Sequence, residues 1–170
     1  IAWSRGEESQ EPSPMHAPPP PGKGYVRSPD VNVLVYAFRD DTPQHRAAHA
    51  WLEDVLNAPS PYAIADLVLL GFLRIVTHPS IFDPPSTLAK ALAFADVVRS
   101  QPNCVQLCEG PGHWQRFGQL CMAAHVKGNL IPDAYLAAMA LAAGADWVSE
   151  DRDFAKFPGL RWRRLEDSGA

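Results

Sequence analysis

Apolar residues along the chain fall into short continuous runs that alternate with longer stretches of helical spacing. Short runs are typical of buried strands, and they occur at "PYAIA" (61–65), "VQLC" (105–108), "DWVSE" (146–150) and "LRWRRL" (160–165). Helical spacing predicts helices over residues 42–57, 67–77, 84–101, 112–126 and 134–144. Because strands alternate with helices, the pattern predicts an α/β fold with a central, mainly parallel sheet and helices on both faces.

Polar residues at the edges of these stretches predict where the helices start and end. Thr42, Asp66 and either Ser86 or Thr87 stand where an N-cap is needed, and Gly144 ends the last long helix. "DRDFAKF" (151–157) is predicted to form a turn or a short helix. The β-branched stretch at residues 25–38 favours one strand by propensity, with a break after Pro29.

Residues 1–24 differ from the rest of the chain, because they are rich in proline and lack hydrophobic periodicity. They are predicted to be a disordered leader, tag or tail, which leaves residues 25–170 as one folded domain. The formal net charge of −4 argues against binding of nucleic acid through the whole surface, so any such contact needs a local basic patch or a metal ion. Three cysteines without a secretory signal predict reduced thiols in a cytoplasmic protein.

Carboxylates gather where ligands bind in parallel sheets, at the carboxyl ends of the strands. Asp30 closes the first apolar stretch, Asp133 heads an otherwise apolar helix, and Asp151 and Asp153 follow the strand that ends at Ser149. Converging carboxylates repel each other unless a cation neutralises them, and hard oxygen ligands favour Mg²⁺ or Mn²⁺. An equally weighted alternative is that each Asp merely caps a helix.

Strand alternation adds a direction to the last acidic cluster. In an extended segment, Asp151 and Asp153 point to one side, while Glu150 and Arg152 point to the other. The alternation therefore predicts that Asp151 and Asp153 face the site and that Glu150 faces away from it.

Four segments together resemble the PIN-domain ribonucleases, and more narrowly the VapC-type toxins of bacterial toxin–antitoxin pairs. They are "DVNVLVYA" (30–37), "HRAAHAWLE" (45–53), "GFLRIVTHPSIF" (71–82) and "GNLIPDAYLAAMALAAGADWVSEDRDFAKFPGLRW" (128–162). The resemblance implies a three-layer α/β/α PIN-like nuclease domain and a Mg²⁺- or Mn²⁺-dependent endoribonuclease that cuts structured RNA such as transfer RNA. It also implies inhibition by a cognate antitoxin and a homodimer.

The resemblance assigns roles to individual residues. Asp30, Asp133, Asp151 and Asp153 match the catalytic, metal-binding acids of the family, and Ser149 and Asn32 match polar residues beside the metal. It also implies a short helix directly after Asp30, against the strand propensity of residues 31–38. The chain departs from the family at Gly71, where many members carry a metal-binding Glu, and Asp66 and Glu150 are weaker candidates to replace that Glu.

That departure keeps a second hypothesis open, in which the chain is an inactive PIN-like module that binds RNA or a partner protein. A phosphatase with an Asp nucleophile is a third hypothesis, but "DVN" (30–32) lacks the second Asp that such enzymes usually place two residues after the first.

Several basic and aromatic residues have a functional and a structural interpretation. Arg74 and Arg152 are candidate contacts to RNA or to an antitoxin, and ordinary solvated charge is the alternative. Trp162 suits base stacking less well than packing in the core. His45 and His49 have the i, i+4 spacing of a metal pair, but no third ligand stands nearby in the sequence, which favours a structural role.

Overall fold

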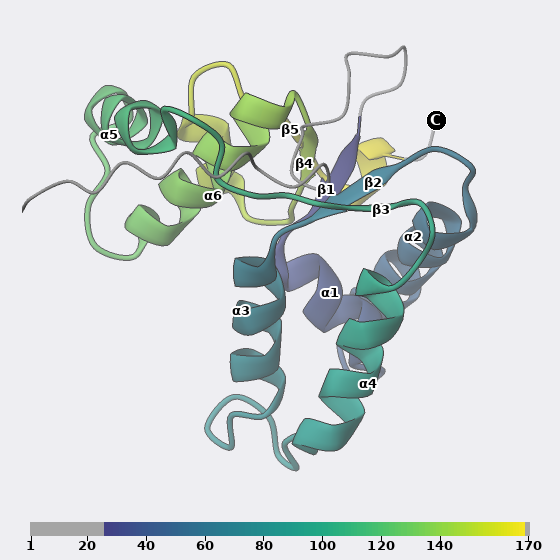
Figure 1. The fold of residues 1–170 in the computed structure, drawn as a ribbon. Helices are drawn as coiled ribbons and strands as arrows, with labels where there is room; N and C mark the ends of the chain where they lie inside the picture. The colour runs from purple at the N-terminus through teal and green to yellow at the C-terminus, as the bar shows by residue number, and fades with distance from the viewer. Residues whose placement is uncertain (1–25, 169–170) are drawn as a thin grey trace, which may run out of the picture.

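Five short strands form one all-parallel sheet at the centre of the computed structural model, which describes residues 26–168 (Figure 1). The sheet order is β3-β2-β1-β4-β5. The strands are β1 (Arg27–Pro29), β2 (Tyr62–Ile64), β3 (Cys104–Gln106), β4 (Asp146–Val148) and β5 (Arg161–Arg163). The predicted α/β class and parallel sheet are confirmed. The interpretation of residues 1–24 as a leader, tag or tail, and the domain start at residue 25, lie outside the described residues.

Six α-helices cover the two faces of the sheet and make three layers. Figure 1 shows α1 to α4 together on one side and α5 with α6 on the other. The helices are α1 (Val31–Phe38), α2 (His45–Asn57), α3 (Asp66–Val76), α4 (Leu88–Arg99), α5 (His113–Ala123) and α6 (Leu130–Ala143), and two 3-10 helices follow, η2 (Arg152–Lys156) and η3 (Leu165–Ser168). Between residues 26 and 168, none of the helices has the length and apolar character needed to cross a membrane.

The segment after β1 is a helix, so its strand propensity was misleading and the helix implied by the family resemblance is confirmed. The Asp30 carboxylate is the N-cap of α1, and its Oδ1 accepts a hydrogen bond from the Val31 N–H at 2.7 Å. Val33 and Leu34 of this helix are fully buried. Burial between the sheet and the neighbouring helices therefore outweighs the β-branched composition.

Two of the predicted caps are wrong and one is confirmed. Helix α2 begins at His45, and the Thr42 hydroxyl instead donates to the Arg39 carbonyl at 2.9 Å. Asp66 is the first residue of α3 and makes no capping bond. Thr87 caps α4 as predicted, accepting from the Lys90 N–H at 3.4 Å.

The core lies on both faces of the sheet and fixes the strands that carry the site. Its largest fully buried side chains include Trp147 of β4, Tyr62 of β2, Phe72 of α3 and Phe154 of η2. The three cysteines are free, half-buried thiols, as the sequence predicted.

Candidate active site

Asp30 and the acidic cluster after β4 meet where the order of the strands in the sheet reverses. From β1 the chain proceeds to β2 and β3 on one side, while β4 and β5 pair on the other side. Pro29 at the end of β1 lies opposite Val148 at the end of β4, and the Asp30 N–H donates to the Val148 carbonyl at 2.9 Å. Asp30 and Ser149, the next residue of each strand, therefore stand together at the switch point where α/β sheets bind ligands.

A buried hydrogen-bond network joins Asp30, Asn32 and Ser149. Asp30 is 5% exposed and Ser149 is fully buried. The Ser149 hydroxyl donates to Asp30 Oδ2 at 2.6 Å. The Asn32 amide nitrogen donates to the same carboxylate oxygen at 2.7 Å and to Ser149 Oγ at 2.9 Å. These contacts fix the orientation of the Asp30 carboxylate, because both of its oxygens are engaged.

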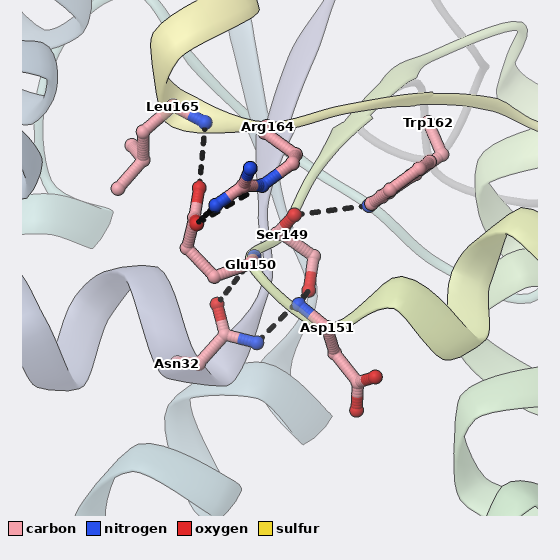
Figure 2. Close-up of polar contacts among 7 residues, drawn as sticks. All are labelled: Asn32, Ser149, Glu150, Asp151, Trp162, Arg164 and Leu165. Carbon is pink, nitrogen blue, oxygen red and sulfur yellow. Dashed lines mark hydrogen bonds and ion pairs between the residues drawn. The ribbon is translucent and has the colours of Figure 1, made fainter.

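The same network holds the residues after β4, which we call the site loop (residues 149–151). The Glu150 N–H donates to Asn32 Oδ1 at 3.2 Å, and the Asp151 N–H donates to Ser149 Oγ at 3.0 Å. Figure 2 shows the side chains of Glu150 and Asp151 leaving the site loop in opposite directions. The predicted orientation of Glu150, away from Asp151, is confirmed.

Asp151 and Asp153 are not arranged by strand alternation, so that part of the sequence argument is wrong. Asp151 caps η2 by accepting a hydrogen bond from the Asp153 N–H at 2.8 Å, and Asp153 forms an ion pair with Lys156. The cap turns the backbone into a 3-10 helix directly after β4. Both carboxylates stay at the carboxyl edge of the sheet, but a helical turn rather than an extended segment places them there.

Asp133 lies in the first turn of α6, a helix that begins three residues earlier, at Leu130. Burial, followed by the charges of Asp30, Asp151 and Asp153 in that order, raises the pKa of Asp133 to about 6. Burial likewise raises the pKa of Asp30 to about 6, opposed by its hydrogen bonds to Ser149 and Val31. The four predicted acids therefore lie close enough to act on one another electrostatically.

Their chemistry suits a hard divalent cation, because four carboxylates share a small region with excess negative charge. Lys156 is paired with only one of them, Asp153. Among residues 26–168, however, no three His, Cys, Asp or Glu side chains converge into a group that could hold a metal ion. The site thus matches Mg²⁺ or Mn²⁺ in ligand type and charge without being a preassembled cage.

Gly71 of α3 faces the start of α1, beside the site. A Cβ atom at position 71 would lie 2.8 Å from Cγ2 of Val31, the residue after Asp30, so the two helices pack too closely there for any larger side chain. Both suggested substitutes have other partners. Asp66 pairs with Arg99 and accepts from Gln106, and Glu150 pairs with Arg164.

The remaining candidates from the sequence lie as follows. Arg74 lies in the last turn of α3 and Arg152 begins η2; both are exposed and, within residues 26–168, form no ion pair, so their contacts to RNA or to an antitoxin stay predictions. His45 Nδ1 bonds to the Tyr36 carbonyl at 2.9 Å, which supports a structural role. The Trp162 indole is half-buried against the core and donates to the Ser149 carbonyl at 2.9 Å, as a core residue would.

Sequence reasoning missed two features of the site. Tyr36 of α1 is half-buried, and burial together with the charges of Glu150, Asp151 and Asp30 raises the pKa of its phenol. Its i, i+4 spacing from Asn32 would have indicated this position, had residues 31–38 been predicted as a helix from the pattern alone. The partners of Glu150 were also missed, and no local pattern indicates them.

Comparison with known proteins adds three findings. The model of the PIN domain family matches residues 29–160. VapC ribonuclease Mb2897 of Mycobacterium bovis is 42% identical over 138 residues, which cover 81% of this chain and 94% of the relative. Ribonuclease VapC31 of Mycobacterium tuberculosis is also 42% identical, over 132 residues, which cover 78% of this chain and 93% of that relative.

A solved structure, of VapBC2 from Rickettsia felis bound to a DNA fragment from its promoter, has a chain with the same fold. It aligns with a TM-score of 0.60 at 18% identity, covering 82% of this chain and 98% of that chain.

Proposed function

The chain belongs to the PIN-domain family and, within it, to the VapC group, and from this premise we propose that it is a metal-dependent endoribonuclease toxin. The observation that carries the proposal is the switch-point cluster, in which the buried Asp30 is oriented by Ser149 and Asn32 beside three further acids. The ribonuclease names of relatives with 42% identity support the same reaction class.

In this proposal Asp30, Asp133, Asp151 and Asp153 hold Mg²⁺ or Mn²⁺. The cation, when bound, supplies the positive charge that activates water and offsets charge on the phosphate. Asn32 and Ser149 keep the Asp30 carboxylate in one orientation. A pKa of about 6 means that Asp30 and Asp133 have lost most of their protons by neutral pH, so their oxygens are available to a cation.

The reaction is hydrolysis of an RNA phosphodiester. A water oxygen bonds to phosphorus in line with the leaving group, the bond from phosphorus to the 3′ oxygen breaks, and the water proton passes to solvent or to the leaving oxygen. The products are a 5′-phosphate and a 3′-hydroxyl. Structured RNA such as transfer RNA is the proposed substrate, and the exposed Arg74 and Arg152 are proposed to contact its backbone or the antitoxin.

A cognate antitoxin is the proposed protein partner, and the VapBC2 structure with the same fold supports it. We further propose a homodimer and action in the cytoplasm, where the three free thiols would stay reduced.

The close packing at Gly71 favours one second candidate, a PIN-like module that binds RNA or a partner without cutting. Helix α3 offers no carboxylate beside Val31, so the metal has one acid fewer than the family pattern. Calorimetric titration with Mn²⁺, paired with a cleavage assay in Mn²⁺, separates the two functions. Tight RNA binding without any cleavage would establish the second one.

The test of the main proposal is sequencing of RNA 5′ ends after expression of the chain and of its Asp30→Asn variant. We expect new 5′-phosphate ends in structured RNA with the parent chain and none with the variant. Asp54→Asn is the matched control, because Asp54 is exposed on α2 and none of the four acids lies on that helix. Equal cutting by the parent and by both Asp30→Asn and Asp133→Asn would refute the site.

A further inference from the structure

The chain returns to the site at the end of β5, where residues 162–165 lie against the site loop (Figure 2). The Ser149 N–H donates to the Arg163 carbonyl at 3.0 Å. In the other direction, the Trp162 indole donates to the Ser149 carbonyl at 2.9 Å. Both backbone polar groups of Ser149 are therefore bonded to residues of β5, outside the acid cluster.

Glu150 is held by the next two residues of the same segment. Arg164 donates to Glu150 Oε2 through Nη2 at 2.6 Å and through Nε at 3.2 Å. The Leu165 N–H donates to the other oxygen, Oε1, at 2.9 Å. The Glu150 side chain is only 15% exposed, so these charged contacts are well shielded from solvent. Both carboxylate oxygens are engaged on the side away from Asp151.

The backbone of Glu150 connects this contact to the acids. Its N–H donates to Asn32 Oδ1, and the amide nitrogen of Asn32 donates to Asp30 and Ser149. One continuous chain of hydrogen bonds therefore runs from Arg164 through Glu150 and Asn32 to the Asp30 carboxylate. A shift of the Glu150 backbone would disturb two hydrogen bonds at once. One is its own bond to Asn32, and the other is the bond from the Asp151 N–H to Ser149 Oγ.

Glu150 also carries a negative charge, which would add to the repulsion among the other acids if its side chain turned into the site. It precedes Asp151 directly, and its charge already reaches Tyr36, as do those of Asp151 and Asp30. Without Arg164, a carboxylate of low exposure would keep only the Leu165 N–H and would lack a counter-charge. Such a charge moves toward solvent or toward any cation in the site, and either movement pulls the site loop with it.

We propose that Arg164 and the Leu165 N–H form a clamp on Glu150 that positions the site loop against Asp30, so that Glu150 is a positioning residue and not a substitute metal ligand. The clamp rests on the proposed function for its effect on catalysis, but its effect on the site loop is independent of any activity. The segment after β5 thereby becomes part of the active site without touching substrate.

The test combines hydrogen–deuterium exchange with RNA cleavage kinetics on the full chain. In Arg164→Gln we expect exchange of the backbone amides of residues 148–154 to rise by about 10-fold, with amides of α4 unchanged as an internal reference. We expect kcat to fall by about 10-fold with KM within twofold of the parent value, as for other residues that orient ligands. Arg99→Gln, which breaks the exposed pair with Asp66, is the matched control and should change neither readout at residues 148–154.

Charge removal should rescue the variant. Glu150→Gln keeps an acceptor for the Leu165 N–H and removes the unpaired charge, so the double variant Glu150→Gln/Arg164→Gln should regain most of the lost kcat. Glu150→Gln alone is nearly isosteric and should retain at least about half of the parent activity. Even if Arg164→Gln fails to fold, this variant distinguishes a positioning Glu150 from a metal-binding one.

Three outcomes would overturn the clamp. Unchanged exchange at residues 148–154 in Arg164→Gln would show that the contact positions nothing. A loss of activity in Glu150→Gln as large as that in Asp30→Asn would make Glu150 a ligand. A rise in KM in Arg164→Gln without rescue by Glu150→Gln would place Arg164 on the RNA. If the parent chain does not cut RNA, the proposed function fails, while the exchange result still decides whether the clamp exists.

Discussion

The two halves of the acid cluster are built by different forces. In the strand half, Asp30, Asn32 and Ser149 lie at the ends of β1 and β4, and hydrogen bonds satisfy their buried polar groups. In the helix half, Asp133 is half-buried on α6, and no described residue donates a hydrogen bond to its carboxylate. Hydrogen bonds thus orient the strand half before any ligand arrives and offset part of the cost of burying Asp30, whereas no described donor offsets burial and repulsion at Asp133, where a cation would relieve them.

The contrast predicts opposite costs of mutation. Removing a group from the strand half breaks a buried network and lowers the free energy of unfolding. Removing a charge from the helix half relieves repulsion and raises the free energy of unfolding. We expect both changes to eliminate catalysis.

The largest expected effect is on cleavage by Asp30→Asn and Asp133→Asn. Each should lower the rate of RNA cleavage by roughly 10³-fold, equivalent to about 4 kcal/mol of transition-state stabilisation. Urea unfolding should separate them, because Asp30→Asn places an amide N–H₂ among the donors from Val31, Asn32 and Ser149 and loses about 2 kcal/mol. Equal stability of the two variants would remove the distinction between the halves.

Next in size is Ser149→Ala, which tests the strand half alone. Its hydroxyl donates to Asp30 and accepts from Asn32 and Asp151, so its loss leaves buried groups without partners and should cost about 2 kcal/mol. The comparison outside the strand half is Asp153→Asn, which breaks an exposed ion pair with Lys156. It should change the free energy of unfolding by no more than about 0.5 kcal/mol. Chemical unfolding in the absence of divalent ions measures both.

A smaller effect is the pH dependence of stability, which tests the helix half. The pKa of Asp133 is about 6 in the folded chain, against 3.8 for an unperturbed Asp, so between these values the folded state binds more protons than the unfolded state. Stability should therefore fall as pH rises from about 4 to about 6. After allowance for partial exposure, Asp133 accounts for about 1 kcal/mol of this fall.

Asp133→Asn should reduce that pH dependence by its own share and leave the share of Asp30, whose pKa is also about 6. Mg²⁺ or Mn²⁺ should restore more stability at pH 7.5 in the parent than in the variant. Thermal unfolding between pH 4 and pH 8 with a chelator, then with the metal, gives both readings. If stability depends on pH in Asp133→Asn as it does in the parent, then burial and neighbouring charges do not destabilise the ionised Asp133 carboxylate.

The smallest expected effect comes from Gly71→Ala, beside the strand half. The new Cβ would meet Val31 at 2.8 Å, and the strain should exceed the gain in helix propensity by about 1 kcal/mol. In a double-mutant cycle, Val31→Ala should remove this cost and give favourable coupling between the two positions. Additive effects would mean that α1 and α3 separate freely there.

The sheet and the meeting of the acids were predictable from the sequence, and the local geometry of the acids was not. Parallel strands bring their carboxyl ends to one edge whatever their details, so Asp30 and the residues after Val148 had to be neighbours. The 3-10 turn at Asp151 depends on one capping bond, which competes with an equally plausible extended strand. The alternation argument chose the wrong one of these two and still placed Glu150 correctly.

Features that depend on distant partners could not be predicted from local pattern. Asp66 looked like a helix cap, but Arg99, 33 positions later, takes its carboxylate. Arg164 is 14 positions from Glu150, and nothing in the charges of either segment specifies that pair over others. Residues 31–38 needed the family resemblance, because their composition favours a strand and only tertiary burial makes them a helix.

The hydrogen bond between Ser149 and Asp30 joins residues that are 119 positions apart. During synthesis on the ribosome, Asp30 emerges early, and most of the chain must follow before β4 can insert beside β1. The orienting partners of Glu150 come later still, at residues 164 and 165. A nascent chain that lacks residues 148–165 therefore carries its first acid without the partners that orient it.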